Sequence, residues 1–452
     1  MAASQNKEEQ KDYLQLFTEL LRDNDLEQVE QRLEEMHPAE IAHLLESLPA
    51  DLREIIWQQV PPEAQGEILT NLNEEVLATV IKGMDTDQLV AATEDLETDD
   101  LADILPGIPQ DVVQELLLTM EQRDRERLHA VLSYDEDSAG GLMNLDAIVI
   151  RADTSLDVVL RYLRRRGEIP ETTDTLFVVE REGRYLGQLP LTTLLTSNPD
   201  KKVEEVMELD EEAIPANMPA REVANRFEQR DLISAPVVDE HNILLGRITI
   251  DDVVDVIRDD AEHSLMSMAG LNEDVDLFSP VLTSTRRRAV WLGINLITAL
   301  LAAWVIGLFE DTIQKFVALA ILMPIVASMG GIAGSQTLTL VIRGIALGQI
   351  SGSNARRLLS KEIWVSIWNG LIWAVVLAVI ADIWFDDYRL GLIIAAAIII
   401  NLLVAAIAGA SIPLLLRRLG ADPALGGGVV LTTVTDVVGF FAFLGLATIF
   451  LM

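Results

Sequence analysis

The stretch that decides the fold is the last one, Ala421–Met452, which reads ADPALGGGVVLTTVTDVVGFFAFLGLATIFLM. From Gly426 onward it is apolar enough to cross a lipid bilayer, and Asp436 is its one ionisable side chain. A charge at bilayer depth costs roughly 2.5–3.5 kcal/mol on insertion scales, so it normally faces a bundle interior or an aqueous path. Asp436 is therefore either an ion site or a protonated carboxyl that hydrogen-bonds neighbouring helices.

Small and oxygen-bearing residues gather around this aspartate. At helical spacing, Gly428, Thr432, Asp436 and Gly439 fall on one side of the segment. We expect this side to line a pore, with Thr435 and backbone carbonyls nearby.

Four more apolar stretches precede this one, each near or above the ~20 residues that a membrane-spanning helix needs. The five predicted spans are 288–309, 316–341, 363–381, 390–416 and 426–451. The second contains Pro324, which kinks a helix, and the pair Gly330 and Gly334, whose spacing lets helices approach closely. The fourth contains Asn401, a further intramembrane polar group. Packing between helices alone would explain the two glycines, and the other interpretation is that they line the pore. We add Gly330, Gly334 and Asn401 to the predicted pore-lining residues.

Charges beside the spans predict the orientation of the chain. Basic residues cluster before the first span, between the second and third, and between the fourth and fifth, whereas the alternate connections are mainly acidic. The positive-inside rule then places the N-terminal half in the cytosol and the C-terminus outside the inner (plasma) membrane. The polar start, MAASQNKEEQ, lacks the apolar core of a signal peptide, which agrees with this orientation.

The 452-residue chain has a net charge of -37 that is spread unevenly. Residues 281–452 carry 11 basic and 8 acidic side chains, or +3, whereas residues 1–280 carry 23 and 63, or -40. So acidic a half repels nucleic acid and attracts cations. The chain has no Cys, which excludes disulfides and thiolate metal sites.

Residues 1–132 predict an acidic domain of short helices punctuated by Pro, arranged as a helical solenoid. Acidic side chains cluster within it at Glu94, Asp95, Glu97, Asp99, Asp100 and Asp103. Each alone is explained by a solvated surface, but as a group they are candidates to hold a divalent cation, with Asp95 and Asp99 as the named ligands.

From about residue 133 the pattern changes to alternating strands and helices, in two similar units, 133–200 and 201–258. Strands at 177–179 and 236–238 match, and Gly187 and Gly246 occupy matching positions that we assign to turns. The pattern resembles a tandem pair of CBS domains, a fold that commonly binds adenine nucleotides such as ATP. That resemblance makes Thr249 and Asp252 candidates for ribose or phosphate contacts. The alternative for these two residues is a helix N-cap followed by an acidic first turn.

An acidic linker helix at 259–285, starting as early as residue 251, joins these units to the membrane half. One side of this helix is apolar, and the other side carries six carboxylates within twelve residues, namely Asp251, Asp252, Asp255, Asp259, Asp260 and Glu262. Like charges at this spacing repel one another, and a divalent cation would relieve the repulsion. The alternative is a merely solvated helix.

The whole order, together with PIVASMGGIAGSQ (324–336) and RRLGADPAL…TTVTDVVG (417–439), resembles the MgtE family of magnesium channels and transporters. The resemblance implies a homodimer with its pore on the two-fold axis, Asp436 holding hydrated Mg²⁺, and Asp422 near the cytosolic mouth. It also implies a linker helix that plugs the pore when Mg²⁺ binds between the cytosolic domains, at positions matching Asp231, Asp252, Asp255 and Asp260. The linker departs from the family at His263 and Ser264.

We therefore predict an all-α N-terminal helical solenoid, an α+β tandem CBS pair and a five-helix transmembrane pore domain over 286–452. The predicted function is a Mg²⁺ channel or transporter that is closed by cytosolic Mg²⁺ and is not an enzyme. No GxxxxGK[ST] loop is present to drive pumping, so ions are expected to move down their gradient. The alternative is an ion-coupled secondary transporter of other divalent cations, such as Co²⁺ or Mn²⁺. An intramembrane aspartyl enzyme would need two Asp at similar depth, a constellation that the spans lack.

Overall fold

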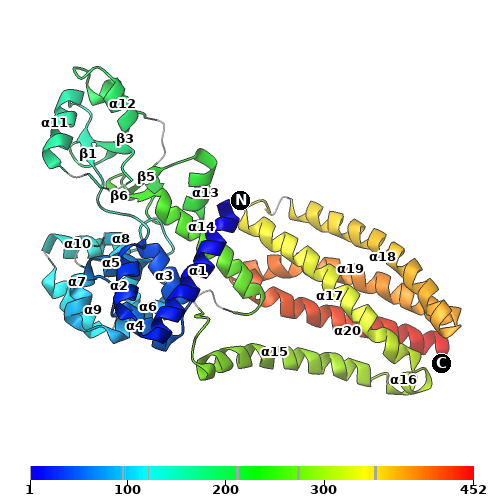
Figure 1. The fold of residues 1–452 in the computed structure, drawn as a ribbon. Coiled ribbons are helices and arrows are strands. Elements are labelled where there is room, and N and C mark those ends of the chain that lie inside the picture. The colour runs from blue at the N-terminus through cyan, green and yellow to red at the C-terminus, as the bar shows by residue number, and fades with distance from the viewer. Residues whose placement is uncertain are drawn as a thin grey trace. The chain divides into compact units, whose positions relative to one another are not determined.

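The computed structural model describes residues 2–93, 96, 98–108, 110–120, 122–167, 169–170, 172–209, 213–271, 275–350 and 354–452 (Figure 1). The chain forms two compact units. One comprises the residues up to Ala261 and the segment that ends at Ser279, and the other comprises the rest from Glu262 onward. The predicted order of a helical domain, two similar units of strands and helices, and long apolar helices is confirmed.

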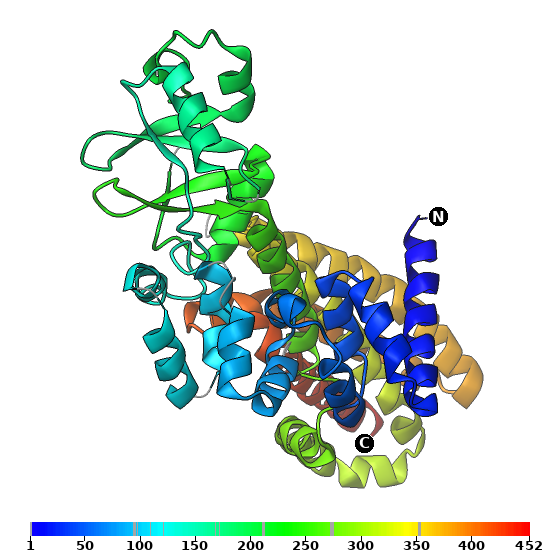
Figure 2. The same ribbon diagram turned by 60° about the vertical axis from the view of Figure 1, so that its left-hand side comes forward.

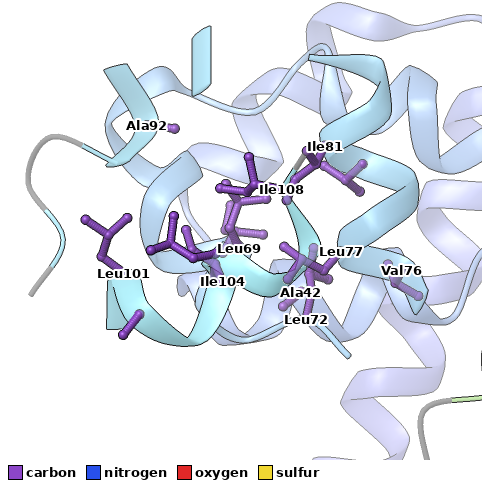
Figure 3. Packing of buried hydrophobic residues seen from close by; sticks show 14 of the residues in the cluster. Ala42, Leu69, Leu72, Val76, Leu77, Ile81, Ala92, Leu101, Ile104 and Ile108 are labelled. Carbon is purple, nitrogen blue, oxygen red and sulfur yellow. The ribbon is translucent and has the colours of Figure 1, made fainter. Parts of the chain in front are cut away.

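The N-terminal domain is built from short helices that stack next-but-one along the chain, as a solenoid requires: α3 packs on α5, α5 on α7, and α7 on α9. Pro38 and Pro62 occupy the first turns of α3 and α5, where a missing N–H is harmless. Figure 3 shows the apolar side chains that fill the core, among them Leu69, Leu77 and Ile104. The elements are α1 (Ala2–Asp23), α2 (Leu26–Glu34), α3 (Pro38–Glu46), α4 (Ala50–Trp57), α5 (Pro62–Thr70), α6 (Glu74–Gly83), α7 (Thr86–Thr93), α8 (Thr98–Ile104), η1 (Leu105–Gly107), α9 (Gln110–Thr119) and α10 (Gln122–Val131).

Two three-stranded sheets of identical topology follow, each with one parallel and one antiparallel pair. The hairpins of the two sheets lie side by side (Figure 2), where the Leu244 N–H donates to Gly183 O at 3.0 Å. The first unit comprises β1 (Val149–Arg151), α11 (Leu156–Arg166), β2 (Thr175–Val179), β3 (Tyr185–Pro190), α12 (Leu191–Thr196) and η2 (Val203–Glu205). The second comprises β4 (Ile214–Pro215), α13 (Ala220–Arg230), β5 (Ser234–Val238) and β6 (Leu244–Thr249).

The assignment of Gly187 and Gly246 to turns was wrong. Both glycines lie inside strands, β3 and β6, opposite Val178 and Val237. A side chain on Gly187 would collide with the backbone of Glu208, which pairs with the neighbouring Gln188. These glycines therefore permit a close approach of a second backbone segment to the strand.

The linker is a single helix, α14 (Ile250–Met268), which starts directly after β6, at the earlier of the two predicted starts, and ends before residue 285. Five helices among the described residues are long and apolar enough to cross a membrane. They are α15 (Val281–Gly307), α17 (Ala318–Ala346), α18 (Ala355–Phe385), α19 (Tyr388–Arg418) and α20 (Pro423–Leu451), with the short α16 (Glu310–Lys315) after α15.

Within the membrane half, α19 is the central helix. It packs against α17, α18 and α20, whereas α15 packs mainly on α20. The helices extend past the predicted apolar stretches: α18 starts at Ala355, eight residues before its predicted span. The extra turns carry Arg356, Arg357 and Lys361, so the helix continues beyond its apolar part.

Candidate metal sites in the last helix and the acidic domain

Helix α20 begins at an aspartate that caps it. The Asp422 carboxylate accepts hydrogen bonds from the N–H groups of Ala424 (2.9 Å) and Leu425 (3.2 Å). A negative charge at this end is favoured by the helix dipole. Asp422 also lies 3.3 Å from Nε2 of His263, near the end of α14. The predicted pore-mouth residue therefore joins the linker helix to the last membrane helix.

The two sides of α20 differ in their surroundings. Leu431, Thr435 and Gly439 are buried against the neighbouring helices. Thr432 is exposed and Asp436 is partly exposed within the single chain. Among the described residues, the Asp436 carboxylate has no hydrogen-bond or ion-pair partner. The face with Thr432 and Asp436 is therefore available to a second chain or to an ion.

Several residues predicted to line the pore are buried between helices within the single chain. Asn401 on α19 is 1% exposed and donates from Nδ2 to Val326 O of α17 at 2.8 Å. Its side chain fills the space beside Gly330 on α17 and Gly439 on α20. Gly334 is likewise buried, with Leu431 of α20 against it. Thr435 is fully buried, and among the described residues its hydroxyl donates to the backbone of its own helix, at the carbonyls of Leu431 and Thr432.

A buried carboxylate at the start of the third membrane helix was not among the predicted site residues. Glu362 on α18 is 5% exposed, and its Oε2 accepts a hydrogen bond from Thr337 Oγ1 of α17 at 3.2 Å. Lys361 forms an ion pair with its Oε1, also at 3.2 Å. The signal in the sequence was an acidic residue directly before a predicted apolar span, 363–381, because acidic residues are rare at such positions.

Carboxylates of α8 and α14 lie close together in the first compact unit, which comprises the helical domain and the two strand-containing units. Burial, followed by the charges of Glu136, Asp100, Asp252 and Asp255, raises the pKa of Asp103 to about 7. The Asp103 side chain still reaches the surface, so water screens part of this repulsion. Burial is also the main cause that raises the pKa of Asp252 to about 7. The helical domain and the linker helix thus meet where negative charge is crowded.

Arginines offset part of the charge on the linker helix. Arg258 forms ion pairs with Asp255 (3.2 Å) and Asp259 (3.5 Å), and Arg221 of α13 pairs with Asp260. The picture of six mutually repelling carboxylates is therefore corrected, because three of them have a cationic partner. Burial nevertheless raises the pKa of Asp255, followed by the opposing effect of Arg258.

Thr249 and Asp252 close the N-terminus of α14. Asp252 Oδ2 accepts hydrogen bonds from the Thr249 N–H (3.1 Å) and Oγ1 (3.0 Å), which matches the N-cap alternative. These bonds oppose the rise in the pKa of Asp252. Nucleotide contact by the same pair stays a prediction.

The other predicted regulatory ligands are dispersed. Asp231 ends α13 in the left-handed conformation, with φ 52° and ψ 43°. Asp251 and Glu262 are exposed. Asp95 and the side chain of Asp99 lie outside the described residues. In the described part of the chain, no three His, Asp or Glu side chains converge into a ready-made metal site.

Comparisons with known proteins cover most of the chain. Residues 323–446 match the family model for MgtE divalent cation transporters, residues 36–137 the MgtE intracellular N domain, and residues 139–199 and 203–259 the CBS domain. The chain is 30% identical over 439 residues to the magnesium transporter MgtE of Thermus thermophilus, covering 96% of this chain and 97% of the relative. It is 28% identical over 432 residues to the magnesium transporter MgtE of Bacillus subtilis, covering 96% of each.

A solved structure is also similar to the soluble part. It is the cytosolic domain of the Mg²⁺ channel MgtE in complex with ATP, which is 32% identical, with a TM-score of 0.49. The match covers 53% of this chain and 98% of that one.

Proposed function

Because the chain belongs to the MgtE family of divalent cation transporters, we propose that it conducts Mg²⁺ across a membrane through a pore that contains Asp436. The observation that carries this proposal is the lone carboxylate on the partly exposed face of α20, without a partner in the described part of its own chain. An intramembrane ionisable group that faces outward from its own bundle needs a second chain or an aqueous path beside it.

Two copies of the chain complete the site in this proposal. Mg²⁺ prefers six oxygen ligands at about 2.0–2.1 Å and loses its water reluctantly. One aspartate cannot strip it, but two Asp436 carboxylates across a two-fold axis would hold the ion through its waters. Gly428 and Thr432 would then form the adjoining wall, whereas Asn401, Gly330, Gly334 and Thr435 hold the helices together. Asp422 would attract cations at the cytosolic mouth.

The direction of transport follows from the orientation and the energy source. By the positive-inside rule, the basic flanks favour an orientation with the acidic half in the cytosol and the C-terminus outside. With no phosphate-binding loop in the sequence, the ion would enter the cytosol down its electrochemical gradient.

Cytosolic Mg²⁺ would close this pathway. The crowded pair Asp103 and Asp252 releases protons and gains a counter-ion when a divalent cation binds, which draws α8 and α14 together. The ion must bind the closed state more tightly than the open one for this to shift the population. The contact between His263 and Asp422 supports a linker helix that acts on the start of α20.

The experiment is Mg²⁺ flux into liposomes that contain the purified chain, with Asp436→Ala as the variant and internal Mg²⁺ varied. We expect flux that needs Asp436 and falls as internal Mg²⁺ rises. Flux that survives in Asp436→Ala would assign this residue to packing. Dependence of the flux on pH or Na⁺ gradients would instead favour the coupled transporter of Co²⁺ or Mn²⁺.

A further inference from the structure

The segment Asp276–Ser279 lies directly before the first membrane helix and is held by the N-terminal helical domain. Asp276 is buried, and its Oδ2 accepts a hydrogen bond from Nη2 of Arg53 at 3.0 Å. The two residues are 223 positions apart in the chain. Both side chains are almost fully buried, with 1% of Arg53 and 5% of Asp276 exposed.

Arg53 is fixed from several sides. Its Nε donates to Leu45 O at 2.9 Å and its Nη2 to Leu48 O at 3.0 Å, at the C-terminal end of α3. Carbonyls at a helix end favour a cation. Removing Asp276 would therefore leave a charge buried without its counter-ion, which is the costly way to break such a pair.

Glu75, in the first turn of α6, holds the other end of the segment. Its carboxylate accepts hydrogen bonds from the Asp276 N–H at 3.0 Å and from Ser279 Oγ at 2.6 Å. The apolar residues of the segment are exposed instead, with 85% of Leu277 and 42% of Phe278 accessible. Directional polar contacts, and not burial of apolar surface, thus fix the position of the segment.

The link from this segment to the membrane helix is short. Ser279 is followed by Pro280, which is the N-cap of α15 and has restricted backbone freedom. Within the segment, the Phe278 N–H donates to Asp276 Oδ1 at 2.9 Å and the Ser279 N–H to Asp276 O at 3.2 Å. Because the bonded segment ends directly before the N-cap of α15, a displacement of the helical domain would also displace the start of α15.

We propose that Arg53 and Glu75 are positioning residues that tie the N-terminal helical domain to α15 through Asp276 and Ser279. This tie is a second route by which cytosolic Mg²⁺ acts on the membrane half, separate from the linker helix, and it rests on the proposed gating. Movement of the helical domain on Mg²⁺ binding at the acidic pair then displaces the first membrane helix directly.

The first test uses Asp276→Asn and Glu75→Gln in full-length chains in liposomes. We expect flux at low internal Mg²⁺ to stay within about twofold of the original, and the Mg²⁺ concentration for half-inhibition to rise about tenfold. Arg32→Gln is the matched control, because Arg32 pairs with Glu35 at an exposed site of the same domain. Equal shifts in the control and in the two variants would overturn the proposal.

The second test restores the tie chemically. The chain has no Cys, so Glu75→Cys with Ser279→Cys introduces the only two thiols. The reduced double variant should lose Mg²⁺ inhibition as Glu75→Gln does, and bridging the thiols with a short bifunctional thiol reagent should restore it. If Mg²⁺ still fails to inhibit flux after the thiols are bridged, the contact between Glu75 and Ser279 does not have the proposed role.

A readout without flux separates this proposal from the proposed function. A single Thr283→Cys, in the exposed first turn of α15, reports the labelling rate by a maleimide with and without Mg²⁺. We expect Mg²⁺ to change that rate in the otherwise unchanged chain and not in Asp276→Asn. The same Mg²⁺ response in both would disprove the tie even if Mg²⁺ flux is confirmed. A response that needs Asp276 would support the tie even if Asp436 proves dispensable.

Discussion

Asp436 in α20 and Asp252 in α14 are the same side chain in opposite surroundings. Asp436 is the single ionisable side chain of α20, on a partly exposed face and without a partner in the described chain. Asp252 is bonded to Thr249 and crowded by other carboxylates, and burial raises its pKa to about 7. A carboxylate without a partner can hold an ion that passes through a pore. A carboxylate crowded by other carboxylates is repelled by them, and a bound cation relieves that repulsion and so changes the free energy of the conformation. The first suits conduction and the second suits control.

The largest effect should separate these two roles in a single assay. In Asp436→Asn we expect Mg²⁺ flux to fall at least about 100-fold at every internal Mg²⁺ concentration, because neutral amides leave no charge to hold the ion. In Asp252→Asn, which keeps a side chain able to cap α14, flux at low Mg²⁺ should be retained. Loss of flux in both variants would contradict the assignment of Asp436 to conduction and of Asp252 to control.

Next in size is the loss of control when the acidic pair is neutralised. Asp103→Asn with Asp252→Asn should raise the Mg²⁺ concentration for half-inhibition by about 10-fold or more, since the repulsion that Mg²⁺ relieves is gone. Asp153→Asn in the first CBS unit removes one negative charge at an exposed site and serves as the control for each single substitution. Unchanged inhibition in the double variant would place the sensor elsewhere.

A smaller effect is expected from pH. Because burial and neighbouring charges raise the pKa of Asp103 and Asp252 to about 7, protons compete with Mg²⁺ below that pH. Half-inhibition at pH 6 should need more Mg²⁺ than at pH 8, by up to about tenfold for the release of one proton. The Asp103→Asn, Asp252→Asn double variant should lose this pH dependence; retaining it would implicate other groups.

The same shifts predict how metal-free stability depends on pH. The folded-state pKa values lie above the unfolded value of 3.8, so protonation stabilises the folded soluble unit. This contribution is complete below pH 3.8 and is lost as the pH rises through about 7. Thermal melting in chelator at pH 6 and pH 8 measures it, and melting independent of pH would contradict it.

The smallest effect is expected on the stability of the helix bundle, from the packing that holds α20 in place. A methyl group on Gly330 would collide with Asn401, so Gly330→Ala should destabilise the bundle by about 1–3 kcal/mol. Gly331 has open space beside it, and Gly331→Ala should instead stabilise the helix by up to about 1 kcal/mol. Opposite shifts in the melting temperature of the detergent-solubilised protein are expected. Equal shifts would deny Asn401 its packing role.

Local patterns in the sequence predicted most of the architecture. Apolar runs identified all five membrane helices, although α18 extends further because a helix continues into basic residues outside the apolar stretch. Strand patterns identified the CBS pair but placed Gly187 and Gly246 in turns. The reason for those glycines is the backbone of Glu208 or Asn144 passing close by, which no local pattern reveals.

The sequence by itself determined which segments enter the membrane, which half is acidic, and that Asp436 is the single ionisable group of the last helix. These properties depend on composition and on periodicity over a few turns. Only the tertiary structure decided that Asn401 packs between Gly330 and Gly439, that Arg258 and Arg221 neutralise part of the linker helix, and that Arg53 meets Asp276. Those pairings join residues on separate elements, or they depend on side-chain rotamers that are set by packing. Local periodicity in the sequence does not indicate which surfaces meet.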